Sequence, residues 1–193
     1  MPSADATRER ILDAVSPLLY REGMRGVGVD ALVAATGLGK ATVYRHFGSK
    51  DLLVEAFLRR RDLAWRRWLA EAVDERTGGG EAPILAVFGA LGEWFASADF
   101  RGCAFINTAA EIALPGHPAL EAVREHKRLL REYLRSLADA QGARDPDALA
   151  DDVLLLVEGA IVTAQIEGSP AAAERARRAA AILVGSHTTK DST

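Results

Sequence analysis

Residues 37–50 read GLGKATVYRHFGSK, and this stretch decides the fold. A glycine turn opens it, a short helix begins at Lys40, and Ser49-Lys50 starts a new helix after Phe47-Gly48. A helix of about seven residues is not stable alone, so neighbouring helices must hold it. Its outer face is basic, hydroxylated and aromatic, which suits DNA phosphates and base edges. The stretch therefore predicts the recognition helix of a helix-turn-helix unit.

Helical spacing of apolar residues continues on both sides of this stretch. Two supporting helices are predicted over 7–22 and 29–36, and a long helix from Ser49. Further helices are predicted beyond the glycine-rich linker 77–80, over about 83–97, 103–114, from Pro118, over 145–167 and from Ser169-Pro170. We expect an all-α fold of about nine helices. It divides into a three-helix DNA-binding domain (1–50), a connecting helix (51–76) and a C-terminal domain (77–193).

Composition limits the class of protein. The 193 residues are 49% apolar, which indicates a globular chain, and the single cysteine excludes an intrachain disulfide. No signal peptide or membrane-spanning stretch is visible, so we expect a cytoplasmic protein without membrane contact. The net charge of −3 conceals an asymmetry: residues 1–68 hold 12 Lys and Arg against 8 Asp and Glu. A basic end on an acidic body fits a protein that presents one end to a polyanion, although uneven surface solvation gives the same pattern.

The first 60 residues resemble the TetR family of transcriptional regulators. The resemblance is dense and specific over about residues 8–60, and only the helical layout agrees beyond. It rests on Ile11-Leu12-Asp13-Ala14, Gly23, Asp30-Ala31-Leu32, Ala35-Thr36-Gly37-Leu38, Thr42-Val43-Tyr44-Arg45-His46-Phe47 and Ser49-Lys50-Asp51-Leu52-Leu53. The resemblance implies a homodimer, a ligand pocket beyond about residue 75 and repression relieved by a small molecule of unknown identity.

The residues of the short helix divide by chemistry into two kinds of DNA contact. Lys40, Thr42 and Arg45 are candidates for base edges, because lysine and arginine suit guanine and a threonine methyl suits thymine. Tyr44, His46 and Lys50 resemble the family's phosphate contacts. Taken alone, Tyr44 also fits a half-buried core aromatic, and His46 an incidental surface histidine. The predicted DNA-binding residues are Lys40, Ala41, Thr42, Tyr44, Arg45, His46 and Lys50.

Two positions depart from the family pattern. Gly28 and Gly39 stand where similar proteins usually place a serine or threonine that caps the helix and touches phosphate. Glycine is an acceptable N-cap but has no hydroxyl, so phosphate contacts there must use backbone N–H groups.

The C-terminal half carries candidate effector-binding residues. An apolar pocket with a few polar groups is the usual small-molecule site, although for any single aromatic a plain core position is the alternative. The candidates are Phe88, Leu91, Trp94, Phe95, Cys103, Phe105, Asn107, Glu111, Tyr133 and Glu158. We expect effector binding to shift the helix over 103–114 and, through it, the long helix that follows Ser49.

Three further features of this half leave alternatives open. Glu158 lies in an apolar run and needs a partner: an arginine across a dimer, a ligand, or water. Cys103 follows Arg101-Gly102 and is either a redox sensor or a small core residue. The arginines at 124, 128, 131 and 135 alternate with glutamates and are expected to form an ion-paired, solvated face.

The partners follow from these assignments. The last two helices, about 147–167 and 170–184, are apolar beyond one face, so we expect a twofold dimer that binds a palindromic operator in double-stranded DNA. No enzyme, metal or cofactor motif is present, so neither catalysis nor a cofactor is expected. The alternative function is a DNA-binding regulator that has no small-molecule effector, acts as an activator, or responds to oxidation of Cys103.

Overall fold

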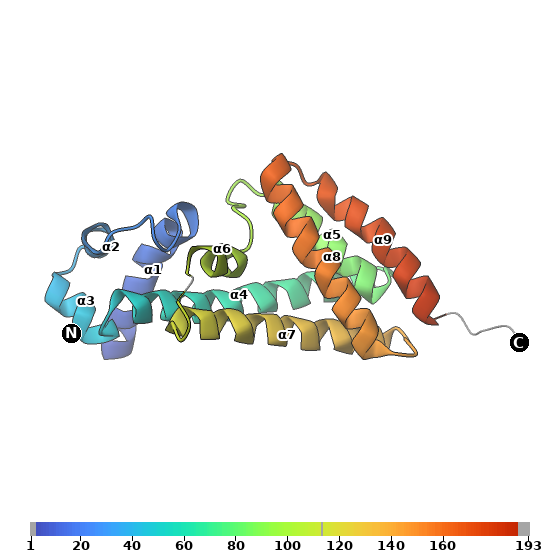
Figure 1. Cartoon of the computed structure of the whole chain (residues 1–193), viewed down its shortest axis with the longest axis horizontal. Coiled ribbons are helices and arrows are strands. Elements are labelled where there is room, and N and C mark those ends of the chain that lie inside the picture. The colour runs from blue at the N-terminus through green and yellow to red at the C-terminus, as the bar shows by residue number, and fades with distance from the viewer. Residues whose placement is uncertain (1–2, 113, 189–193) are drawn as a thin grey trace, which may run out of the picture. The chain divides into compact units, whose positions relative to one another are not determined.

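The computed structural model describes residues 3–112 and 114–188. All of its regular secondary structure in these ranges is helical, which confirms the all-α expectation (Figure 1). The helices are α1 (Ala4–Glu22), α2 (Val29–Thr36), α3 (Lys40–Phe47), α4 (Lys50–Gly78), α5 (Pro83–Ala96), α6 (Ala104–Glu111), α7 (Pro118–Ala140), α8 (Pro146–Glu167) and α9 (Ala171–Thr188). No helix in the described ranges is long and apolar enough to cross a membrane.

Contacts between residues divide the chain into two compact units. Unit 1 comprises Met1–Leu63 and Ala104–His126, and unit 2 comprises Ala64–Cys103 and Lys127–Thr193. Helix α6 and the start of α7 thus group with the N-terminal helices, a long-range association that no sequence pattern signals. The domain boundaries at residues 50 and 76 follow sequence motifs and stay a prediction.

Unit 1 is built around α1, which packs against α2 and α3. The Ser3 side chain accepts a hydrogen bond from the backbone N–H of Ala6 and so caps the start of α1. The buried residues Ile11, Val15 and Leu19 follow the helical period and supply one face of the core. Pro17 lies inside this helix without ending it.

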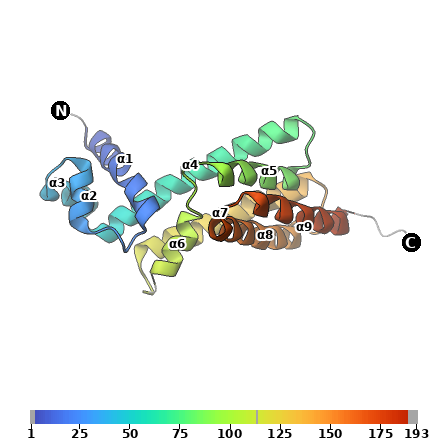
Figure 2. The same cartoon turned by 90° about the horizontal axis from the view of Figure 1, so that it is seen from above.

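Unit 2 contains α5, α8 and α9, which pack pairwise against one another (Figures 1 and 2). Small side chains allow this close approach: a Cβ placed on Gly92 of α5 would lie 3.5 Å from the Cβ of Ala173 on α9. Ala172, Ala176 and Ala180 are buried on the same helix. The alanine-rich sequence of α9 is therefore a packing surface within the chain.

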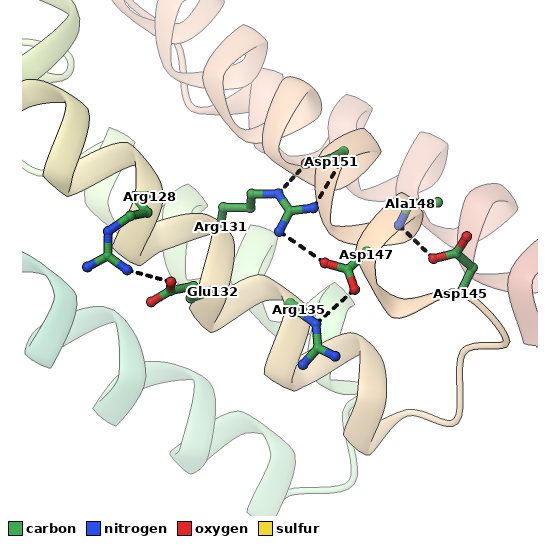
Figure 3. Close-up of polar contacts among 8 residues, drawn as sticks. All are labelled: Arg128, Arg131, Glu132, Arg135, Asp145, Asp147, Ala148 and Asp151. Atoms are coloured by element: carbon green, nitrogen blue, oxygen red, sulfur yellow. Dashed lines mark hydrogen bonds and ion pairs between the residues drawn. The ribbon is translucent and has the colours of Figure 1, made fainter.

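An ion-pair network joins α7 to α8 (Figure 3). The Arg131 guanidinium bonds both carboxylate oxygens of Asp151 and, 3.1 Å away, one oxygen of Asp147. Arg135 donates to the other Asp147 oxygen at 3.0 Å. Hydrogen bonds from these guanidinium groups lower the pKa values of Asp147 and Asp151 below their ordinary range. The expected ion-paired face is present, but two of its arginines pair with α8 and not with neighbouring glutamates.

Several predicted boundaries need correction. The helix expected to reach residue 114 ends at Glu111, and the expected linker at 77–80 is helical as far as Gly78. The last helix, expected over 170–184, continues to Thr188. Residues 186–188, which the sequence assigns to a frayed tail, complete its last turn. The rest of that expected tail, 189–193, lies outside the described residues.

Candidate nucleic-acid interface

Glycines stand at both ends of the α2–α3 turn. Gly37 caps the C-terminus of α2 with φ +64°, a left-handed conformation that glycine adopts without strain. Gly39 precedes α3 and its carbonyl accepts hydrogen bonds from the N–H groups of Thr42 and Val43. Val43 and Phe47 are 4% and 5% exposed, so they attach the inner face of α3 to the unit 1 core.

The opposite face of α3 is open. Lys40, Ala41 and Arg45 are exposed, and Tyr44 and His46 are half-buried. The Tyr44 ring also lines a small hollow above Val43 and Phe47, so it combines core packing with an accessible edge. The short helix therefore presents cationic, aromatic and small side chains on one accessible surface, as a recognition helix requires.

Two of the predicted cationic contacts already have partners in the chain. The Lys40 ammonium lies 3.1 Å from a carboxylate oxygen of Asp30, but both side chains are exposed and such a pair is weak. The Lys50 ammonium donates to the backbone carbonyl of Val27, immediately before α2. Lys50 thus holds the entry to the helix-turn-helix, and its phosphate contact stays a prediction.

Arg8 of α1 is a supporting residue that sequence reasoning missed. Its guanidinium donates to the His46 carbonyl at 2.8 Å and lies 4.2 Å from the centroid of the Phe47 ring. These contacts hold the C-terminal end of α3 on α1. No spacing pattern could have revealed them, because 38 residues separate Arg8 from His46.

No other side chain supplies the cap that Gly28 and Gly39 cannot provide. Both helices that follow them begin without a side-chain hydrogen bond at the N-cap. Their φ angles, −70° and −69°, suit any residue, and a Cβ at either position would meet no atom within 4 Å. The missing hydroxyls are thus a feature of the sequence and not a steric requirement.

The predicted effector-binding residues do not all fall in one unit. Unit 2 holds Phe88, Leu91, Trp94, Phe95, Cys103, Tyr133 and Glu158, and unit 1 holds Phe105, Asn107 and Glu111. Phe88, Leu91, Phe95 and Cys103 are buried. For these four residues the structure shows core packing.

Aromatic rings gather on α4 and α5. The Trp94 ring centroid lies 5.6 Å from that of Trp65, 6.2 Å from that of Trp68 and 5.0 Å from that of Phe100. Trp94 and Phe95 are among the predicted pocket residues, but Trp65, Trp68 and Phe100 are not. A spacing of three residues between Trp65 and Trp68, which places both on one helix face, was the available signal.

Two polar candidates in unit 2 have distinct environments. Glu158 pairs with the Lys127 ammonium of the same chain at 2.8 Å, a partner that the sequence analysis did not consider. Tyr133 has a buried hydroxyl with no hydrogen-bond partner among the described residues. Burial and the nearby Asp74 carboxylate raise the pKa of Tyr133 to about 12.

The unit 1 candidates make internal contacts. A carboxylate oxygen of Glu111, the last residue of α6, accepts the backbone N–H of Arg25 at 2.7 Å. The same carboxylate occupies the space that a Cβ on Gly23 would need. The Phe105 ring stacks on His126, with centroids 3.6 Å apart. Glu111 therefore connects α6 to the turn between α1 and α2.

Comparisons with known proteins agree with this geometry. Residues 11–57 match the family described as bacterial regulatory proteins, tetR family, and residues 80–180 match the tetracyclin repressor-like C-terminal domain. The transcriptional regulator AcuR of Cereibacter sphaeroides is 30% identical over 181 residues, which cover 88% of this chain and 81% of that protein.

Solved structures give the same result. SCO4454, a TetR-family transcriptional regulator from Streptomyces coelicolor, superposes with a TM-score of 0.84 at 28% identity, covering 95% of this chain and 96% of that one. A putative regulator from Streptomyces avermitilis gives 0.79 at 32% identity, with 95% and 99% covered. These proteins are described as transcriptional regulators and not as enzymes. The chain belongs to the TetR family of DNA-binding transcriptional regulators.

Proposed function

We propose that this regulator is a homodimeric repressor, released from a palindromic operator by a small-molecule effector. The observation that carries the proposal is the open face of α3, where Lys40, Tyr44 and Arg45 lie accessible on a helix anchored by Val43 and Phe47. A single such helix covers few base pairs, so a twofold pair of helices would read two half-sites about one helical turn apart.

Roles within α3 follow from the side chains. Tyr44, beside the core, serves a phosphate, whereas the more exposed Arg45 and Lys40 reach base edges. Tyr44→Ala should weaken binding to all sequences alike, and Arg45→Ala should also relax base preference by about 1–3 kcal/mol at one position. Binding to a panel of operator mutants distinguishes the roles. Identical losses across the panel for both variants would contradict the assignment.

The dimer contact is proposed on α8 and α9. Leu155 and Ile166 of α8 are 70% and 79% exposed, and Ile182 of α9 is 75% exposed. Leu155 and Ile166 are eleven residues apart, about three turns, so they lie on one side of α8. A second copy related by a twofold axis would cover this apolar surface with the same surface of its own.

Charge substitution tests the dimer contact. Ile166→Lys should produce monomers at micromolar concentration and lower the affinity for a palindromic site. The dimer would otherwise bury this lysine near the same lysine of the second copy, where the two positive charges would repel. Leu63→Lys is a matched control, since Leu63 is 66% exposed but lies outside α8 and α9. Sedimentation measures the mass of both variants. A dimeric Ile166→Lys protein, or a monomeric Leu63→Lys protein, would place the interface elsewhere.

The effector is proposed to bind in unit 2 near Tyr133. A buried hydroxyl without a partner loses the hydrogen bonds it makes in water, and a ligand atom would restore one. A thermal-shift screen of small molecules tests this, because a ligand that prefers the native state raises the melting temperature. The response of true effectors should weaken in Tyr133→Phe.

Transmission to DNA is proposed through Glu111. Since its carboxylate holds the Arg25 N–H, movement of α6 would displace the turn that leads to α2. Glu111→Ala, which removes the acceptor oxygen, should therefore uncouple effector binding from DNA release while both individual affinities persist. Unchanged release in this variant would exclude the contact as the route.

The competing proposal, oxidation of Cys103, has less support because this thiol is buried. If the Cys103→Ser variant still releases DNA after oxidant treatment, the oxidation proposal is excluded.

A further inference from the structure

A hollow in unit 1 is lined by no residue of α3 and by none of the predicted effector-binding residues. Its volume is about 200 Å³. It is lined by Met24, Arg25, Lys50, Asp51, Val54, Ile112, Leu114 and His117. This volume is below the roughly 300–1,000 Å³ of drug-sized sites, so it suits a small molecule.

The floor of the hollow is apolar. Met24, Val54 and Ile112 are at most 8% exposed and come from three separate segments of unit 1. Such a surface favours a hydrocarbon or ring over water. The rim carries the charged groups, so a ligand with one apolar and one charged end fits the arrangement.

One carboxylate, that of Asp51, lines the hollow beside His117. The Nδ1 atom of His117 accepts the backbone N–H of Ala119 at 3.1 Å, which assigns the proton of the neutral ring to Nε2. The Nε2 atom lies 3.4 Å from an Asp51 carboxylate oxygen. Asp51 also lies in the first turn of α4, where the helix dipole stabilises a negative charge. The neighbouring Glu111 carboxylate accepts the Arg25 N–H.

Two cationic residues, Arg25 and Lys50, also line the hollow. The Arg25 guanidinium has no ion pair or hydrogen bond among the described residues, and the Lys50 ammonium bonds only the neutral Val27 carbonyl. The lining of the hollow therefore holds two cationic side chains and one carboxylate, and its net charge is positive. We propose that this hollow binds a small organic acid, with its carboxylate on Arg25 and Lys50 and its apolar part on Met24, Val54 and Ile112.

Binding there affects DNA through Lys50. A carboxylate competes with the Val27 carbonyl for the ammonium that holds the entry to α2, and with DNA phosphate for the same charge. An acid bound in the hollow therefore weakens operator binding, and the coupling is reciprocal. This second consequence rests on the proposed DNA-binding role of α3, whereas binding of the acid does not.

Benzoate and hexanoate are suitable probes, with benzamide and hexanamide as neutral controls. In the methyl-labelled full chain, each acid should shift the Met24 and Ile112 methyl resonances saturably. The amides should bind about tenfold more weakly or not at all. Arg25→Gln should weaken acid binding about tenfold, because it removes a charged hydrogen-bond donor. The matched control is Arg21→Gln, an exposed arginine in the last turn of α1 that does not line the hollow.

Three results would overturn the site. The first is no Met24 shift with either acid at about 10 mM, a concentration about ten times the dissociation constant of a millimolar site. The second is equal acid binding by Arg25→Gln and wild type, and the third is acid-induced shifts confined to unit 2 methyls such as those of Leu91. The last result would support an effector site in unit 2. A chain that fails to bind any operator without acid contradicts the proposed function but leaves the hollow supported if the Met24 shifts and the Arg25 dependence hold.

Discussion

The uncapped start of α3 gives a prediction whose size follows from the structure. Gly39 is the N-cap of α3, has φ −69° and ψ 147°, and has open space around the position of a Cβ. A serine there keeps the backbone unchanged, and its hydroxyl can accept an N–H of the first helical turn. The substitution Gly39→Ser should therefore stabilise the helix.

Two effects set the magnitude. Replacing glycine restricts the unfolded chain and contributes about 0.4–1 kcal/mol where the native backbone suits the new residue. A serine N-cap adds a few tenths of a kcal/mol over glycine. Together they give about 0.5–1.5 kcal/mol, or a 2- to 10-fold slower hydrogen exchange for α3 amides that exchange by local opening.

Gly37→Ser is the matched control. It lies two residues away, and a Cβ there also meets no atom within 4 Å, but its φ of +64° is costly for any residue with a Cβ. We expect destabilisation of about 1–2 kcal/mol. Gly39→Ala separates the chain-entropy effect from the hydroxyl. Faster exchange in Gly39→Ser, or no loss of protection in Gly37→Ser, would refute this account of the turn.

Three other outcomes can be measured. Asp151→Asn should lower the free energy of unfolding at pH 7. Because Arg131 lowers the Asp151 pKa in the folded state, this stabilisation is present above pH about 4, and the difference from wild type in urea titrations should shrink as the pH falls below that value. Tyr133→Phe should leave the melting temperature unchanged or raise it, since it removes a buried hydroxyl without a described partner; a drop equivalent to about 1 kcal/mol or more would reveal a hydrogen bond there. Arg8→Ala should weaken DNA binding about tenfold or less without altering base preference, because Arg8 holds the His46 carbonyl and makes no base contact; altered preference on an operator panel would make it a reading residue.

The local features of the DNA-binding unit could be predicted from the sequence alone. The α2–α3 turn depends on a glycine at 37, and the anchoring of α3 depends on apolar residues at 43 and 47, so both features can be read from the local sequence. Helical periodicity is a local property, and it located all nine described helices to within a few residues. The boundary errors occurred at helix ends, where small differences in free energy decide whether a residue joins the helix.

Contacts between distant segments needed the tertiary structure. The Arg8 bond to His46, the Lys127 pair with Glu158 and the Glu111 bond to Arg25 join residues that no periodic pattern relates. A charged residue in a sequence shows that a partner is required, but which partner it finds depends on how the helices pack. Residue order therefore determined the helices and the chemistry of the α3 surface, whereas packing decided which polar groups hold the fold and which, like the Arg25 guanidinium, stay available to a ligand.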